Sequence, residues 1–173
     1  MILSSCSKTS NGSKTPDFDT QLVELDNSKF EIPKSWEKIT APSSMKQTIF
    51  APIGADLSAG TSNVSFIITK ASTNADSLED LKTNSSTFEE QIKSIFPKAT
   101  DFKFNNFKSN AGDVFTIEYK IPYGNTTLQQ TQYYLLMEHY VVVITATDIN
   151  DNVSPNVNDV AKHMIHSFKL NVQ

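Results

Sequence analysis

The sequence predicts an α+β fold, in which an antiparallel sheet of about six or seven strands is covered by helices. Three observations lead to this prediction. Several short segments alternate apolar and polar residues, as strands with one buried face do. Two longer segments repeat apolar residues at the spacing of an amphipathic helix. In the second half of the chain, strand-like segments follow one another with only short turns, which is typical of an antiparallel meander.

The first half of the chain contains the shorter predicted strands. They lie at residues 29–32, 37–39, 47–50 and 64–69. Pro33 starts the turn after the first of these strands, and Pro52 ends the third. The polar residues 56–62 favour a loop before the fourth.

A helix is expected next, from Ser77 to Phe96. Ser77 and Asp80 have the spacing of a capping box, and Pro97 stops the helix. One apolar stripe runs along it, through Leu78, Leu81, Phe88, Ile92, Ile95 and Phe96. Residues 84–87 are poor helix formers, so we expect a kink or a break there.

The second half predicts a meander closed by a helix. The expected strands are 102–107, 113–121, 127–137 and 140–147, with a hairpin turn at 122–125. The last strand is the most apolar and is therefore expected at the centre of the sheet. The final helix presents its own apolar stripe to the sheet, through Val157, Val160, Ala161, Met164, Ile165 and Phe168.

Composition excludes some classes of function. The chain has 173 residues, a net charge of −4 and 15 basic residues that are all Lys. Without Arg it lacks the bidentate fork that grips phosphates and guanine edges, and its charge opposes a nucleic-acid backbone. We therefore expect no nucleic-acid partner.

Cys6 is the single cysteine of the chain, so it cannot form an internal disulfide. It could be a buried thiol, a nucleophile or an acceptor of lipid. Leu3-Ser4-Ser5-Cys6 resembles the bacterial lipoprotein box, in which the cysteine receives diacylglycerol, and a polar, Ser- and Thr-rich run follows it. This resemblance implies a signal peptide, residues 1–22 as a lipobox remnant and flexible tether, and residues 23–173 as a single domain. It places the protein in the bacterial envelope, anchored by lipid at Cys6 on the outer face of the cytoplasmic membrane.

Further segments resemble the Mog1/PsbP/DcrB-like domains. They are Phe30-Glu-Ile-Pro-Lys-Ser-Trp36, the Tyr-Gly-Asn turn at 123–125, the apolar run 140–146 and the closing His166-Ser167-Phe168. The resemblance implies an α/β/α sandwich and, with the lipobox, the envelope lipoprotein branch. It also implies binding and assembly rather than chemistry, and no catalytic residue of the family can be carried over. Trp36 is expected in the core.

Two groups of side chains could hold a metal. Asp148, Asn150 and Asp151 resemble the Asp-x-Asn-Asp-Asn calcium linker of cadherins, but the same residue types also serve turns and helix caps. Asp159, His163 and His166 are spaced to chelate zinc, although structural zinc sites use four ligands. Helical rotation puts these three on an exposed face, so solvated loops and faces are the expected interpretation, with no cofactor.

The sequence leaves three functions open. We expect a non-catalytic envelope domain that binds a protein or peptide-like partner. The alternative is an accessory lipoprotein of a transport system that binds a small molecule or an ion. The third is a hydrolase, for which Glu138-His139 could supply acid–base chemistry, but the chain has no Gly-x-Ser-x-Gly elbow.

Overall fold

The computed structural model describes residues 17–25, 27–40, 47–70 and 78–171. Its elements are β1 (Thr20–Leu25), β2 (Ser28–Pro33), β3 (Trp36–Ile39), β4 (Thr48–Pro52), the 3-10 turn η1 (Leu57–Ala59), β5 (Asn63–Lys70), α1 (Leu78–Thr83), α2 (Ser85–Ile95), β6 (Thr100–Lys108), β7 (Asp113–Tyr123), β8 (Thr126–Leu136), β9 (Tyr140–Asp148), α3 (Val157–Ser167) and β10 (Lys169–Leu170). The predicted α+β fold is confirmed.

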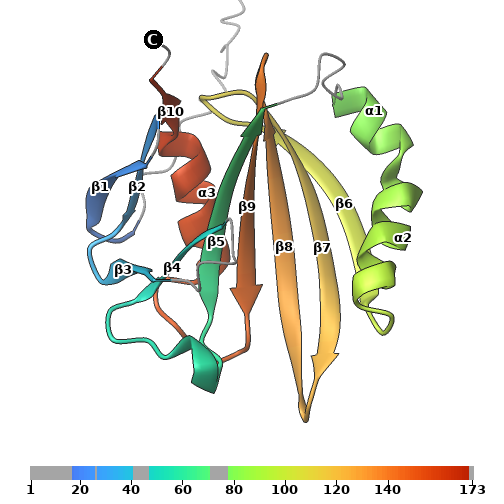
Figure 1. Ribbon diagram of the computed structural model, residues 1–173, viewed down its shortest axis with the longest axis horizontal. Coiled ribbons are helices and arrows are strands. Elements are labelled where there is room, and N and C mark those ends of the chain that lie inside the picture. Colours follow the sequence, from blue (N-terminus) through green and yellow to red (C-terminus); the bar gives the residue numbers. More distant parts are fainter. Residues whose placement is uncertain (1–16, 26, 41–46, 71–77, 172–173) are drawn as a thin grey trace, which may run out of the picture.

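Seven strands form the main sheet, in the order β3-β4-β5-β9-β8-β7-β6. All neighbouring pairs in it are antiparallel. The apolar strand β9 has three strands on each side of it (Figure 1). Its predicted central position is confirmed.

A second, three-stranded sheet of order β1-β2-β10 lies beside the first (Figure 1). The sequence predicts one sheet, so the separate place of the 29–32 segment was not foreseen. The expected tether boundary at residue 22 also needs correction. β1 begins at Thr20, which pairs with Pro33, because β2 offers a partner to the whole of β1.

Each face of the main sheet carries its own hydrophobic core. Strand register places Phe66, Ile144 and Tyr133 on one face, where α3 and the small sheet cover them. Trp36, with no exposed surface, belongs to this core as predicted. The predicted packing of the last helix on the sheet is also confirmed.

The opposite face is covered by α1 and α2, which pack on Phe115, Ile117 and Tyr119 of β7. The predicted break is present, since α1 ends at Thr83 and α2 begins at Ser85. The single apolar stripe is wrong at its end: α2 stops at Ile95, which is 70% exposed, and its C-cap Phe96 is 37% exposed. The expected Ser77–Asp80 cap falls outside the described side chains.

Candidate functional site

The loop that follows β9 is organised around a buried serine. Ser62 is only 1% exposed, and its hydroxyl donates to Oδ1 of Asp151 at 2.6 Å. The backbone N–H of Ser62 donates to Oδ2 of the same carboxylate at 3.0 Å, and the Ile149 N–H donates to the Ser62 hydroxyl at 3.0 Å. Burial, the largest influence, would raise the pKa of Asp151, but the hydrogen bonds from the Ser62 hydroxyl and N–H, with those from the backbone of Val153 and Asp151, together hold that pKa below its usual value.

The two other calcium candidates also take part in loop structure. Oδ1 of Asp148 accepts the backbone N–H of Asn150 at 2.7 Å and lies 3.5 Å from the Ser62 hydroxyl. Asn150 has a φ of 64°, in the left-handed region that asparagine tolerates well. The structure therefore brings Asp148, Asn150 and Asp151 together through turn hydrogen bonds. Turn formation was the alternative to calcium binding that these residue types allow.

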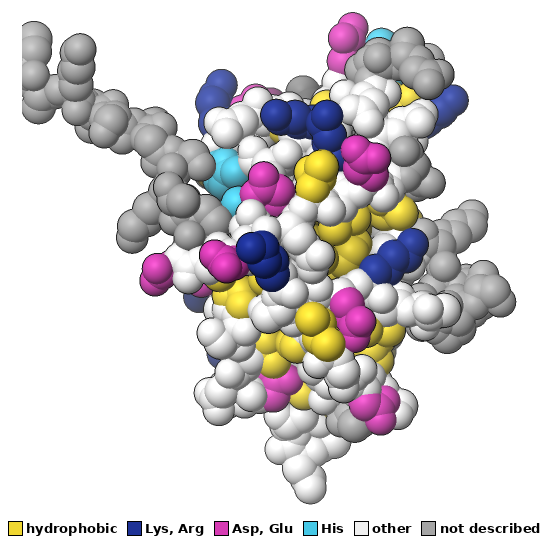
Figure 2. Space-filling view, turned by 90° about the vertical axis from the view of Figure 1, so that its left-hand side faces the viewer, with side chains coloured by type: hydrophobic (Ala, Val, Ile, Leu, Met, Phe, Trp, Pro, Cys, Tyr) yellow, Lys and Arg dark blue, Asp and Glu magenta, His cyan; other side chains and the backbone are white. Residues whose placement is uncertain are grey.

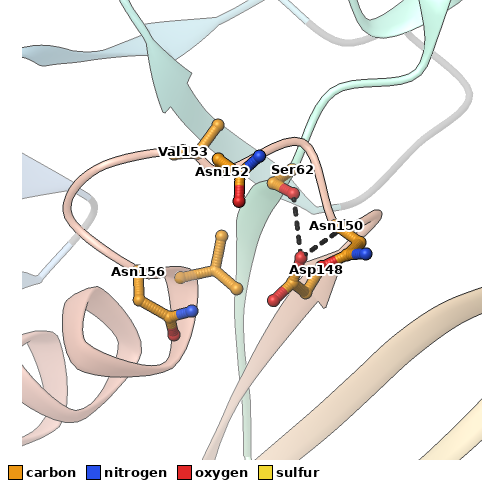
Figure 3. Close-up of a pocket in the computed structure, with 7 residues that line it drawn as sticks. Ser62, Asp148, Asn150, Asn152, Val153 and Asn156 are labelled. Atoms are coloured by element: carbon orange, nitrogen blue, oxygen red, sulfur yellow. Dashed lines mark hydrogen bonds between the residues drawn. The ribbon is translucent and has the colours of Figure 1, made fainter.

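A hollow of about 100 Å³ lies between this loop and the start of α3 (Figure 3). Its lining consists of Ser62, Asp148, Asn150, Asn152, Val153, Asn156 and Val157. Asn156 caps α3, since its side chain accepts the N–H of Asn158. The lining is rich in amide and carboxylate groups.

A larger hollow of about 320 Å³ opens beside it, at the ends of three adjacent strands. We call it the strand-end trough, and its lining is Lys120, Thr127, Gln129, Asp148 and Asn150. Lys120 of β7 pairs with Gln129 of β8, and Gln129 pairs with Asp148 of β9, so the three side chains form a row across the sheet. Asp148 and Asn150 also line the hollow of Figure 3, which makes the two continuous.

The trough continues on its other side into a hollow of about 190 Å³. Here β6 is irregular, and Asp101 has a φ of 58°. The Lys120 ammonium lies 2.8 Å from the Asp101 carboxylate, and this hydrogen bond holds the pKa of Asp101 below its usual value. Phe102 lines the hollow and stacks on the ring of Tyr119, with centroids 5.5 Å apart.

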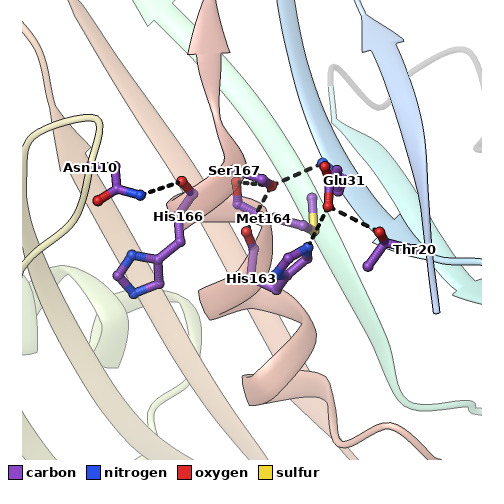
Figure 4. Close-up of polar contacts among 7 residues, drawn as sticks. All are labelled: Thr20, Glu31, Asn110, His163, Met164, His166 and Ser167. Carbon is purple, nitrogen blue, oxygen red and sulfur yellow. Dashed lines mark hydrogen bonds and ion pairs between the residues drawn. The ribbon is translucent and has the colours of Figure 1, made fainter. Parts of the chain in front are cut away.

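The zinc candidates lie elsewhere, on α3 (Figure 4). The His163 side chain is only 14% exposed, and its Nε2 lies 3.0 Å from Oε2 of Glu31. The Thr20 hydroxyl donates to the same oxygen at 3.0 Å, and the two hydrogen bonds, that with His163 first, lower the pKa of Glu31. The expected exposed face is therefore wrong for His163, because the small sheet packs against this side of α3.

His166 is also partly covered. Its Nδ1 is buried and has no hydrogen-bond partner among the described residues, and its ring lies 5.9 Å from that of Phe107. Burial, and then the nearby His163, lower the pKa of His166. Asp159 alone of the three is exposed. Within the described part of the chain, no group of three or more acidic, His or Cys side chains is placed to hold a metal ion.

The polar contacts on α3 do not form a nucleophile and base. The Ser167 hydroxyl donates to the His163 carbonyl oxygen at 2.8 Å and accepts the Glu31 N–H at 3.0 Å, so it joins backbone segments (Figure 4). The other acid–base candidate, Glu138-His139, lies exposed between β8 and β9 with its ends 3.7 Å apart. The Ser167 contacts therefore join α3 to β2, and Glu138-His139 belongs to the connection between β8 and β9.

Large hydrophobic side chains are exposed at two places. Leu22 and Ile53 belong to the part of the molecule that carries the small sheet, β3 and β4, where Figure 2 shows hydrophobic patches between charged side chains. Ile95, Phe96 and the 64%-exposed Tyr123 lie at the end of α2 and at the β7–β8 turn. Thr100, which follows α2 at the start of β6, pairs with Lys120 of β7. Tyr123 lies three residues further along β7.

Sequence reasoning missed most of the trough and its neighbours. Ser62 carries no signal, since a serine at a loop end is ordinary. Lys120 stands between Tyr119 and Ile121, as solvent-facing strand residues often stand between apolar ones, and only the register reveals its row with Gln129 and Asp148. Glu31 gives no sign of its partner, which lies 132 residues away.

None of the described helices is long and apolar enough to cross a membrane. Cys6 lies outside the described residues, so its lipid attachment stays a prediction.

Known proteins resemble this chain in structure. PsbP (CyanoP) from the cyanobacterium Synechocystis sp. PCC 6803 matches with a TM-score of 0.62 at 15% identity, over 97% of this chain and 98% of that one. LpqN of Mycobacterium tuberculosis, described as involved in cell envelope biogenesis, matches with a TM-score of 0.56 at 9% identity, over 88% and 90%. A protein from Bacteroides thetaiotaomicron matches with a TM-score of 0.59 at 8% identity, over 85% of this chain and 46% of that one.

In sequence, no protein-family model and no curated protein matches the chain. At these identities the structural matches describe the fold, and the predicted Mog1/PsbP-like fold is confirmed.

Proposed function

We propose that this PsbP-like chain is a non-catalytic domain of the bacterial envelope, anchored by lipid at Cys6, which binds a protein or peptide-like partner. The mechanism is tethering. An anchor confines the domain to the outer face of the cytoplasmic membrane and so raises its effective concentration toward partners in the same layer. A diacylglycerol supplies two acyl chains, which suffice for stable anchoring.

Two observations support an envelope location. The run Leu3-Ser4-Ser5-Cys6 has the residue types of a lipoprotein cleavage site, and a polar segment follows it. LpqN, which has the same fold over most of both chains, is described as a protein of cell envelope biogenesis.

The observation that carries partner binding is the position of the exposed hydrophobic side chains Ile95, Phe96 and Tyr123. Interfaces combine a few apolar and aromatic anchors with a polar rim. Here the ion pair of Glu89 and Lys93 on α2 lies just before Ile95 in the chain and supplies charged neighbours. We call this set, Ile95, Phe96 and Tyr123, the docking end.

Ile95 and Phe96, at the end of α2, also lie on the favourable side of the molecule, whereas Tyr123 lies at the β7–β8 turn (Figure 1). α1 and α2 occupy one end of its long axis, and β1, the first strand after the tether, occupies the other (Figure 1). A domain held through residues before β1 would present α2 away from its attachment. This arrangement favours the reach of a tethered domain toward a partner.

Anchoring is tested first, with labelled palmitate fed to bacteria that express the full-length protein. We expect label in the wild-type protein and none in Cys6→Ala, with the protein accessible to protease on the outer face of spheroplasts. A wild-type protein without label, or one found in the cytosol, would refute the proposed location.

Docking is tested with a photo-crosslinking amino acid placed at Phe96 or Tyr123 of the anchored protein. We expect each position to give the same partner adduct, and Ile95→Ala to weaken both. The same amino acid at Leu22, an exposed hydrophobic position at the other end, serves as the control. Equal adducts from all three positions would show that the docking end has no special role.

A second function, an accessory lipoprotein of a transport system that binds a small molecule, is favoured by one observation. The strand-end trough and the two hollows that continue it form a concave, polar surface away from the docking end's apolar side chains. A ligand there would be held by side-chain hydrogen bonds.

A further inference from the structure

We propose that the strand-end trough binds a neutral, hydroxyl-rich ligand, a saccharide. The trough is lined by Lys120, Thr127, Gln129, Asp148 and Asn150. This inference goes beyond partner binding at the docking end, because it concerns other residues and another class of ligand.

The register of the sheet builds the recognition surface. Lys120, Gln129 and Asp148 are cross-strand neighbours on three adjacent strands, about 5 Å apart from one strand to the next. Along this row the hydrogen-bonding capacity changes from a donor, through an amide that both donates and accepts, to an acceptor. Thr127 and Asn150 add a hydroxyl and a second amide. Sugar hydroxyls both donate and accept, so they can be satisfied anywhere along such a row.

The charges at the two ends of the row are already engaged within the protein. The Lys120 ammonium is paired with Asp101 at 2.8 Å. Oδ1 of Asp148 accepts the Asn150 N–H at 2.7 Å and lies within 3.5 Å of the Ser62 hydroxyl. An ionic ligand would have to compete with these contacts. A neutral ligand needs only the hydrogen-bond donors and acceptors of Lys120 and Asp148 that these contacts leave unused. The trough therefore favours hydrogen bonding over ion pairing.

Main-chain recognition of a peptide is blocked at this place. β7, β8 and β9 are interior strands, each hydrogen-bonded to a neighbour on both sides. A peptide cannot add a strand to them, so the ligand must be recognised by side chains alone. This argument favours a saccharide over an extended peptide.

The adjoining hollow extends the polar lining. It shares Lys120 and Gln129 with the trough and adds the charged residues Asp101, Lys103 and Glu118. Glu118 and Lys120 are two residues apart on β7, so their side chains lie on the same face of the sheet. A ligand larger than the trough would therefore meet further hydrogen-bonding groups on this side.

The test is an NMR titration of the purified, isotope-labelled chain with two neutral probes, cellotetraose and the tetramer of N-acetylglucosamine. We expect binding with a Kd of about 1 mM or tighter for at least one probe, with shifts at the amides of the trough. Because the ligand is uncharged, we expect that Kd to stay within about twofold between roughly 50 mM and 500 mM NaCl.

Two threonines provide a matched pair of variants. Thr126 and Thr127 are adjacent and exposed on β8, but only Thr127 lines the trough, because alternate strand residues point to opposite faces. Gln129→Ala is expected to weaken binding about tenfold and Thr127→Ala about threefold, while Thr126→Ala leaves it unchanged. The wild-type amide spectrum outside the trough serves as the check on folding.

The proposal is overturned if neither probe shifts the trough amides, or if Thr126→Ala weakens binding as much as Thr127→Ala. It is also overturned if tetra-alanine binds at the trough and the two glycans do not. The titration uses the unanchored chain and no partner, so its failure leaves the palmitate and crosslinking results intact.

Discussion

Replacement of Ser62 by alanine should destabilise the protein more than any other single hydroxyl removal on β5 or its loop. The Ser62 hydroxyl lies 2.6 Å from the Asp151 carboxylate and also accepts the Ile149 N–H. A hydrogen bond to a charged group contributes about 1.5–3 kcal/mol, and a buried N–H left without an acceptor costs about 1–3 kcal/mol. Because the two losses overlap and water can relieve part of each, we expect about 3 kcal/mol in total.

The assay is urea unfolding at pH 7, with thermal unfolding as a second measure. A loss of about 3 kcal/mol corresponds to a fall in Tm of roughly 6–12 °C for a domain of this size. Ser65→Ala is the matched control, because Ser65 is buried on β5, which begins directly after Ser62, but its hydroxyl has no hydrogen-bond partner among the described residues. We expect it to cost less than about 1 kcal/mol.

The pH dependence of this loss identifies its cause. Asp151 has a folded pKa below 3.8, its unperturbed value, so its contribution to stability is present above that pH and is lost as the pH falls through the folded pKa. Since the Ser62 hydroxyl supplies one of the hydrogen bonds that lower this pKa, the difference in unfolding free energy between wild type and Ser62→Ala should narrow in acid. A loss equal to that of the Ser65→Ala control, or a gap unaffected by acid, would refute this account of the loop.

Three further predictions concern the core, the small sheet and one turn. Trp36→Ala should cost about 3–5 kcal/mol in urea unfolding, but Trp36→Phe clearly less, since the buried indole N–H has no acceptor among the described residues to lose. Glu31→Gln should lower the free energy of unfolding by about 0.5–1 kcal/mol at pH 7, a small loss because the contact of Glu31 with His163 is partly exposed. This loss should disappear as the pH falls below 4.5, because the Glu31 carboxylate, whose folded pKa is lowered, is then progressively protonated in the wild type. An undiminished loss in acid would contradict this account. Gly112→Ala should lower the free energy of unfolding by at least about 2 kcal/mol, because the new Cβ would lie 2.7 Å from a backbone oxygen of β8. Gly54→Ala, with open space around it, should lower it by about 1 kcal/mol. Equal shifts in Tm for the two variants would argue against the close approach at Gly112.

The periodic parts of the chain were predictable from sequence. β9 could be placed at the centre because its residues 140–146 form an almost continuous apolar run, although only Val142, Ile144 and Ala146 are buried. The stripe of α3 was equally legible, since five of its residues are buried: Val157, Val160, Ala161, Met164 and Ile165. In each case the local pattern is imposed by the core itself.

The small sheet could not be predicted, because its information is not local. β10 has two residues, too few for any alternation, and it pairs with Lys29 and Ser28 near the other end of the chain. The same holds for the polar sites. His163 appears exposed by helical rotation, and only the placement of Glu31 beside it accounts for its burial.

The small sheet has a consequence for the order of folding. β1 and β2 form a local hairpin, but their apolar face is covered by α3, and β10 completes their sheet. During synthesis, the β1–β2 hairpin must therefore wait for α3 and β10, which come last among the described elements, before it gains its remaining native neighbours. Such distant pairings slow folding. Loss of β10 should therefore be felt most strongly at β2, which lies far from it in the sequence.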